Sequence, residues 1–136
     1  MKFFASSLFV ILLGISTMQA QLAVTVLPPK VIGQKAIVTL AMKNDFSENI
    51  KSARAACFLL DEQGKMVGQS AKWVINKNEN KIGLTPGTTN EFNFVITSSQ
   101  PFTTTNLTAK VSFNRIVLDS GKLADPNKDV QIQNTR

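Results

Sequence analysis

Apolar residues recur at every second position in several short segments of this chain, which is the spacing of strands with one buried face. The alternation is clearest over 91–97, where Phe92, Phe94 and Ile96 form the apolar set. Clusters of Gly, Pro, Asn and Asp separate the segments and favour turns. We predict seven strands, at about 22–27, 34–44, 51–60, 65–75, 91–97, 107–118 and 128–133.

The segment 53–68 has the pattern of a β-hairpin, because Asp61–Gly64 forms a turn between two strand-like runs. Seven short antiparallel strands with turns between them are typical of an immunoglobulin-like (fibronectin III-like) β-sandwich. The first strand, 22–27, stops at Pro28-Pro29, and we expect it to lie at a sheet edge. The apolar parity shifts at Ile116, which indicates a bulge in the sixth strand.

The third strand presents two different faces. One face consists of small and apolar residues, and we expect it to point into the core. The other face carries the charged Arg54 and is therefore expected to point outward. Phe58 and Leu60 belong to this outward face. They would form an apolar strip that contacts a partner, unless another strand or loop covers them. The inward set is Ala53, Ala55, Cys57 and Leu59.

Trp73 is the single tryptophan of the chain. It lies in line with Val67 and Ile75 in the fourth strand, so we expect it in the core or half-buried at an edge. The alternative is an exposed platform on which a sugar ring stacks, with nearby amide side chains as hydrogen-bonding partners. The candidate amides follow in the polar loop at Asn76, Asn78 and Asn80.

Residues 1–20 have the layout of a secretory signal peptide. Lys2 precedes an apolar run over 3–15, and a segment of small and polar residues ends at Ala20. The run is shorter than the ~20 residues of a membrane-spanning helix, although an uncleaved anchor is the alternative. We expect a signal peptide over 1–20, a single domain over 21–136, and a secreted or periplasmic location.

Composition limits the classes of partner. Residues 1–20 hold one lysine, so the formal net charge of +6 becomes +5 for 21–136. The lysines are dispersed and arginines are few, whereas a nucleic-acid groove needs clustered arginines with aromatic partners. We therefore expect no nucleic-acid ligand, and weak attraction to an anionic surface or polymer is the alternative. One cysteine, Cys57, cannot form an intrachain disulfide.

The chain lacks the residues of common catalytic and metal sites. It has no histidine, so a Ser–His or Cys–His pair and an imidazole metal site are excluded. Cys57 has the pattern of a small buried residue rather than a reactive thiol. Asp61 and Glu62 point apart and suit a turn. We expect no enzyme activity, metal or cofactor. A calcium loop is the alternative for four residues whose spacing matches no EF-hand: Asp119, Asp125, Asn127 and Asp129.

Around the hairpin, the chain resembles the bacterial FxLYD family of immunoglobulin-like domains. The motif would fall on 57–61, where Leu59 and Asp61 match, while Cys57 and Leu60 replace the Phe and Tyr of the motif. The resemblance covers roughly 37–96. It implies an extracytoplasmic domain of unassigned activity and no catalytic residues. Flanking segments also resemble the family: Met42–Asn44, Gly64–Val67, Leu84–Gly87 and Phe92.

These patterns predict an exported, non-catalytic binding or accessory module that engages protein partners at the cell envelope. The expected contact residues are Phe58, Leu60 and Trp73. One alternative is a carbohydrate-binding module that uses Trp73 and the loop Asn76–Asn80. The other is a structural subunit of an envelope assembly, in which an unpaired edge accepts a strand from another chain at Leu22–Leu27 or Val130–Ile132.

Overall fold

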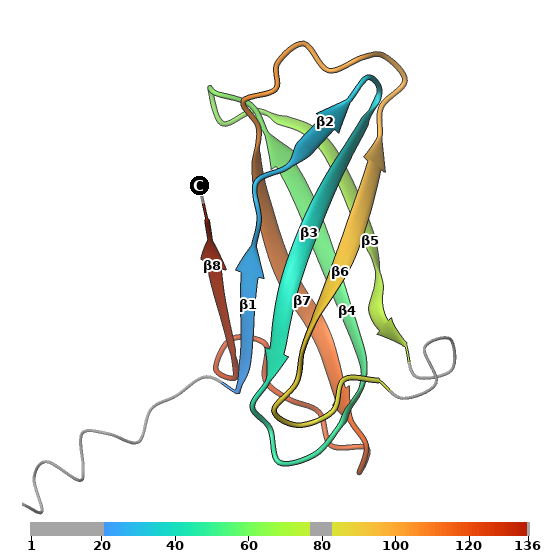
Figure 1. Ribbon diagram of the computed structural model, residues 1–136, viewed down its shortest axis with the longest axis vertical. Helices are drawn as coiled ribbons and strands as arrows, with labels where there is room; N and C mark the ends of the chain where they lie inside the picture. Colours follow the sequence, from blue (N-terminus) through green and yellow to red (C-terminus); the bar gives the residue numbers. More distant parts are fainter. Residues whose placement is uncertain (1–20, 77–82, 136) are drawn as a thin grey trace, which may run out of the picture.

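The computed structural model describes residues 21–76 and 83–135, in which strands form two sheets and no helix occurs (Figure 1). The signal peptide expected over 1–20 lies outside the described residues, as do Asn78 and Asn80. The eight strands are β1 (Leu22–Val26), β2 (Lys30–Ile32), β3 (Lys35–Asn44), β4 (Ile50–Leu60), β5 (Met66–Asn76), β6 (Thr89–Thr97), β7 (Thr108–Leu118) and β8 (Val130–Asn134).

The five-stranded sheet is built around β3. One side of β3 pairs antiparallel with β2 and then with β1, and the other side pairs antiparallel with β6. β8 completes this sheet by pairing parallel to β1. The three-stranded sheet has the order β5-β4-β7 and is antiparallel throughout. The described chain is therefore an all-β, sandwich-like arrangement of two sheets.

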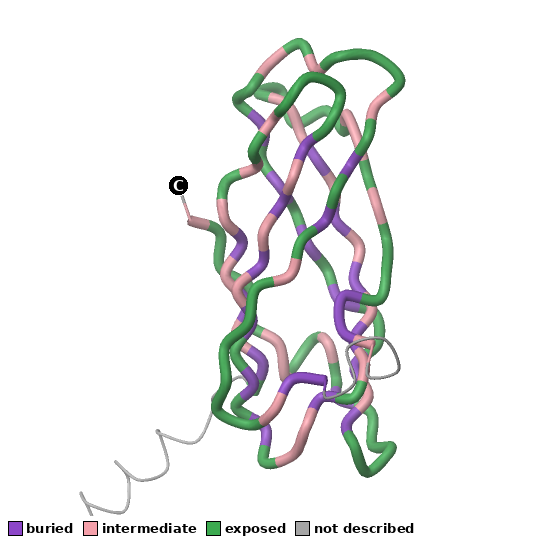
Figure 2. The backbone as a smooth tube through the Cα atoms, turned by 45° about the vertical axis from the view of Figure 1, so that its right-hand side comes forward, coloured by how far each residue is buried: buried purple, intermediate pink, exposed green. Residues whose placement is uncertain are grey.

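The core lies between the two sheets and confirms the predicted inward faces of β3 and β4. Figure 2 shows buried residues alternating with more exposed ones along the strands. The inward set of β4, Cys57 included, is completely buried. Phe94 is the largest fully buried side chain, and Ile96 is buried beside it on β6. The inward residues of β3 are also fully buried: Ala36, Val38, Leu40 and Met42.

Two predictions about the strands are wrong. The structure has eight strands rather than seven, because Lys30–Ile32 forms the short strand β2 beside β3. Those three residues lie between Pro29 and Gly33 and are too few to show an alternation. The first strand is not an edge, since β3 flanks β1 on one side and β8 on the other. The parallel β1–β8 ladder joins the two ends of the described chain, which no local pattern can reveal.

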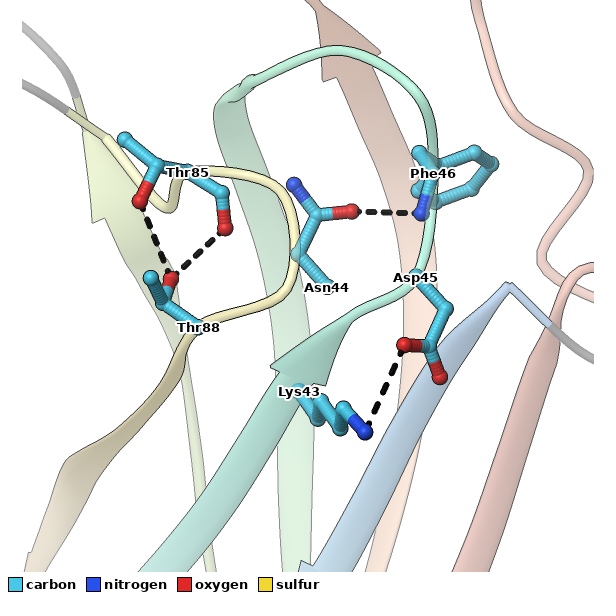
Figure 3. Close-up of polar contacts among 6 residues, drawn as sticks. All are labelled: Lys43, Asn44, Asp45, Phe46, Thr85 and Thr88. Atoms are coloured by element: carbon cyan, nitrogen blue, oxygen red, sulfur yellow. Dashed lines mark hydrogen bonds and ion pairs between the residues drawn. The ribbon is translucent and has the colours of Figure 1, made fainter.

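Asn44, at the end of β3, is the one polar side chain that is fully buried in the described residues. Its Nδ2 donates hydrogen bonds to the carbonyl oxygens of Leu84 (2.8 Å) and Glu48 (3.0 Å). Its Oδ1 accepts a hydrogen bond from the backbone N–H of Phe46 at 2.8 Å (Figure 3). The Asn44 side chain therefore holds the turn after β3 and the turn that begins at Leu84 together at one end of the sandwich.

Candidate functional site

The outward side chains of the three-stranded sheet bring the predicted contact residues onto one surface. In the register, Arg54 lies opposite Trp73 on β5 and opposite Arg115 on β7. Phe58 lies opposite Lys110 on β7. We term this surface the outer face and define it by six residues: Arg54, Phe58, Leu60, Trp73, Lys110 and Arg115.

Trp73 reaches the outer face because β5 contains an irregularity. Ala53 pairs with Ile75, but the next residue, Arg54, pairs with Trp73, so the register shifts by one residue between them. Val74 and Ile75 are consequently both buried, while 39% of Trp73 is exposed. The predicted alignment of Trp73 with Ile75 is therefore wrong, since a β-bulge reverses the side of the sheet to which later residues point.

The outer face is basic and contains no compensating carboxylate. The sequences of β4, β5 and β7 hold three lysines and two arginines, but no aspartate or glutamate. The guanidinium carbon of Arg54 lies 6.0 Å from the centroid of the Trp73 ring, which is the geometry of a cation–π contact. Arg54 and Arg115 are cross-strand neighbours with like charges, an arrangement that disfavours the isolated sheet.

Phe58 and Leu60 are half-buried on the same face, so the predicted apolar strip is partly accessible. Phe58 lies between Gln69 of β5 and Lys110 of β7. Leu60 lies beside Met66, which is 50% exposed. Chemically, the outer face offers two aromatic rings and aliphatic side chains next to cationic groups, which suits an acidic surface with an apolar projection.

The exposure of Trp73 can be measured directly by fluorescence. We expect acrylamide to quench the emission strongly, because Trp73 is on the outer face and the chain contains no other tryptophan and no tyrosine. Arg54→Ala should increase the quenching constant, since the guanidinium would no longer shield the ring. The urea-unfolded protein provides the upper limit. A blue-shifted emission that resists acrylamide would contradict this placement.

Cys57 lies on the opposite side of β4, in the core. Its side chain is completely buried between the sheets, and burial raises the pKa of the thiol from 9.0 to about 11. Removal from water destabilises the thiolate, which is the form that reacts. The environment of Cys57 therefore agrees with the predicted role as a small core residue.

The raised pKa of Cys57 predicts a loss of stability at high pH. Between pH 9 and about 11 the unfolded chain ionises its thiol while the folded chain does not, so the free energy of unfolding falls as pH rises. The expected slope is about 1.4 kcal/mol per pH unit in this window. Urea titrations measure it, with Cys57→Ala as the control. Identical slopes for both proteins would contradict the prediction.

The acidic residues singled out in the sequence act in turns. Asp61 Oδ1 accepts hydrogen bonds from the backbone N–H groups of Gln63 and Lys65, each at 2.9 Å. Asp129 Oδ2 accepts one from the backbone N–H of Asp125 at 2.8 Å. No group of three or more potential metal-ligating side chains occurs in the described part of the chain. These carboxylates therefore stabilise loop conformations.

Two outer-face residues, Lys110 and Arg115, are not evident from the sequence pattern. Both lie on β7, and their proximity to Phe58 and Arg54 depends on long-range pairing between β4 and β7. The predicted bulge near Ile116 is confirmed, because the register shifts where Arg54 pairs with Arg115 and the next residue pairs with Phe113. That parity shift was a usable signal that the outward set of β7 changes near Arg115.

Comparison with known proteins identifies the fold alone. No family model and no curated protein matches the sequence. A putative ApaA protein from Bordetella pertussis has a similar structure, with a TM-score of 0.52 and 16% identity over 79% of this chain and 89% of that one. IrmA from Escherichia coli gives a TM-score of 0.53 and 10% identity, with 87% and 95% covered. No helix in the described residues is long and apolar enough to span a membrane.

Proposed function

We propose that the protein is an exported, non-catalytic module of immunoglobulin-like type that binds a protein partner at the cell envelope through the outer face. The observation that carries this proposal is the partly exposed Trp73, which lies beside Arg54 on a sheet without acidic residues. Trp and Arg are enriched among the residues that contribute most to protein interfaces. The layout of 1–20 and the resemblance to FxLYD domains support export.

The charge of the outer face indicates the kind of partner. On the outer face, Lys110 of β7 lies opposite Phe58 of β4, and Arg115 of β7 lies opposite Arg54 of β4. An acidic partner would relieve the repulsion between Arg54 and Arg115, and the charges would also accelerate the encounter. The partner is therefore expected to place carboxylates around an apolar projection that contacts Phe58 and Trp73.

Position-specific crosslinking tests this proposal. A photoreactive phenylalanine analogue replaces Phe58, and in a control protein it replaces Val95, which is exposed on the five-stranded sheet. In the organism that carries the gene, we expect a discrete protein adduct from position 58 and none from position 95. Arg54→Glu combined with Arg115→Glu should abolish the adduct. An adduct that is independent of position, or that survives charge reversal, would refute the outer face as the binding site.

A carbohydrate-binding module is the second candidate, and the exposed ring of Trp73 favours it. The guanidinium of Arg54 lies 6.0 Å from the centroid of the ring, so a sugar would have to stack on the part of the indole that remains exposed. Fluorescence titration with envelope polysaccharides distinguishes the two candidates. A saturable change that Trp73→Ala abolishes would support carbohydrate binding. If the polysaccharides cause no change in fluorescence and the protein still binds a partner protein, the protein-binding proposal stands.

A further inference from the structure

Among the residues that the structure describes, no strand pairs with β7 on the side away from β4 over the stretch Ala109–Phe113. The three-stranded sheet ends at β7, whereas the five-stranded sheet continues through β1 to β8. The following part of β7 is covered, because the N–H of Leu118 donates to the carbonyl of Lys122 (2.9 Å) and the N–H of Ala124 donates to the carbonyl of Ile116 (3.0 Å). We term the stretch Ala109–Phe113, which no described strand pairs with on this side, the β7 edge. The side chains of Ala109, Val111 and Phe113 point into the core and are buried.

One side-chain contact fixes the direction of the backbone groups in the β7 edge. Nδ2 of Asn134 on β8 donates a hydrogen bond to the carbonyl oxygen of Ala109 at 2.7 Å, so this carbonyl points away from β4. Alternate residues of a strand direct their backbone groups to the same side. The N–H and C=O groups of Val111 and Phe113 therefore also point away from β4. No described residue forms a hydrogen bond with them on that side.

β8 projects past the β7 edge, and its inner face is incompletely covered. The parallel register pairs Val130 with Leu22 and Ile132 with Val24, so all four side chains share the inner face. Leu22 and Val24 are buried, but 36% of Ile132 is exposed. Figure 1 shows β8 at the left margin, beyond β7. The three-stranded sheet has no strand beneath this part of β8.

The opposite side of the sandwich is closed by side chains. A Cβ on Gly68 of β5 would lie 2.9 Å from Cγ2 of Ile96 on β6, and Nζ of Lys72 lies 5.5 Å from the centroid of the Phe94 ring. Between β7 and β8, Asn134 bridges a wider opening. A cavity of about 610 Å³ occupies one end of this opening, and its lining includes Leu27, Pro28, Asp61, Leu107, Ala109 and Asn134.

We propose that the β7 edge accepts an extended segment of a partner polypeptide as a fourth strand of the three-stranded sheet, antiparallel to β7 and beneath β8. The free N–H and C=O groups of Val111 and Phe113 match the backbone of an added strand. Every second side chain of that strand faces Val130 and Ile132 and should be apolar. An acidic residue is favoured at an outward position next to Lys110.

A second copy of this chain does not fit by pairing its own β7 edge symmetrically. In such a pair, each β8 would project past its own β7 into the space that the other β8 occupies. This proposal does not rest on the outer face, because the β7 edge lies along the side of the sheet rather than on its outward surface.

Amide hydrogen exchange measured by NMR tests the proposal in two steps. In the protein alone, the N–H of Val111 should exchange rapidly, whereas the N–H of Ser112, which points toward β4, should exchange slowly. The probes are short synthetic peptides that alternate valine with threonine and carry one glutamate. Their addition should protect Val111 and Phe113 and should leave the exchange of exposed residues on β6 unchanged.

N-methylation of the peptide provides a matched control that leaves the protein unaltered. Methyl groups on the peptide nitrogens that face β7 should weaken binding by about tenfold or more, since each removes a backbone hydrogen bond. Methyl groups on the alternate nitrogens should have little effect. Asn134→Ala should preserve or increase affinity, because it releases the carbonyl of Ala109 for the added strand.

Three results would overturn the proposal. The first is slow exchange of Val111 in the dilute, peptide-free protein, which would show that the β7 edge is not free. The second is protection of Val111 that rises with protein concentration together with dimer formation, which would make a second copy the occupant. The third is the absence of protection by every alternating peptide, or an equal effect of both N-methylation patterns.

Discussion

Gly83→Ala should lower the free energy of unfolding by about 4 kcal/mol, measured by urea denaturation. Gly83 has a φ of +69°, a left-handed conformation that costs a residue with a Cβ about 1–2 kcal/mol. The new Cβ would also overlap the carbonyl oxygen of Ile50, and overpacking of this kind costs about 1–3 kcal/mol. That oxygen accepts the N–H of Leu84, so the backbone cannot retreat without losing a hydrogen bond.

Gly87→Ala is the matched control for this substitution. Gly87 also has a positive φ, +77°, but a Cβ at this position would meet no atom within 4 Å. Its replacement should therefore cost only the conformational term of about 1–2 kcal/mol. Equal losses for the two variants would show that the close approach of Gly83 to Ile50 has no energetic consequence.

Asn44→Ala should destabilise the protein by about 3 kcal/mol, although it removes only one small polar side chain. The substitution removes the side-chain partner of the Phe46 N–H and of the Glu48 carbonyl. It also removes one of the two hydrogen bonds to the carbonyl of Leu84, which still accepts the N–H of Ile50. Asn44→Asp should be at least as harmful, because it turns a carboxylate oxygen toward two carbonyl oxygens. Urea denaturation and differential scanning calorimetry measure both effects.

Asn93→Ala serves as the comparison for Asn44. The Asn93 side chain accepts a hydrogen bond from Thr39 Oγ1 at 2.7 Å, but this contact is exposed to water. Its loss should change the free energy of unfolding by less than about 0.5 kcal/mol. If Asn44→Ala lowered the free energy of unfolding no more than Asn93→Ala, the buried amide would not stabilise the contact between the two turns.

Most of the strands and their inward faces could be predicted because a strand with one buried face carries apolar residues at every second position. The uninterrupted alternation of Phe92, Phe94 and Ile96 is the clearest instance, and Phe94 and Ile96 are buried in the structure. The prediction fails where a strand is too short to show a period, as in Lys30–Ile32. It also fails for Trp73, because a bulge changes the phase of β5 without a residue type that marks it.

The candidate site could be predicted only in part for a related reason. Arg54 identified the outward face of β4, to which Phe58 and Leu60 were correctly assigned, and both are half-buried there. Lys110 and Arg115 join them through the pairing of β4 with β7, and the sequence contains no local trace of that pairing. The openness of the β7 edge likewise depends on β8 joining β1, a contact between the two ends of the domain.

The two proposed surfaces both belong to the three-stranded sheet, but they would recognise different parts of a partner. The outer face would recognise the side chains of a partner through Trp73, Phe58 and cationic neighbours. The β7 edge would recognise a backbone, and its selectivity would come from apolar residues facing Ile132. Crosslinking at position 58 and peptide protection at Val111 report on these surfaces separately, so either proposal can fail while the other stands.

The parallel ladder between β1 and β8 has a mechanical consequence. Leu22 begins β1 beside Asn44 at one end of the sandwich, and Asn134 ends β8 beside Val26, which pairs with Leu40 near the middle of β3. Tension applied between these two points pulls the paired strands along their own axes in opposite directions. The evenly spaced hydrogen bonds of a parallel ladder then share the load and must rupture together in shear, rather than one at a time. A domain held at both ends should therefore resist stretching.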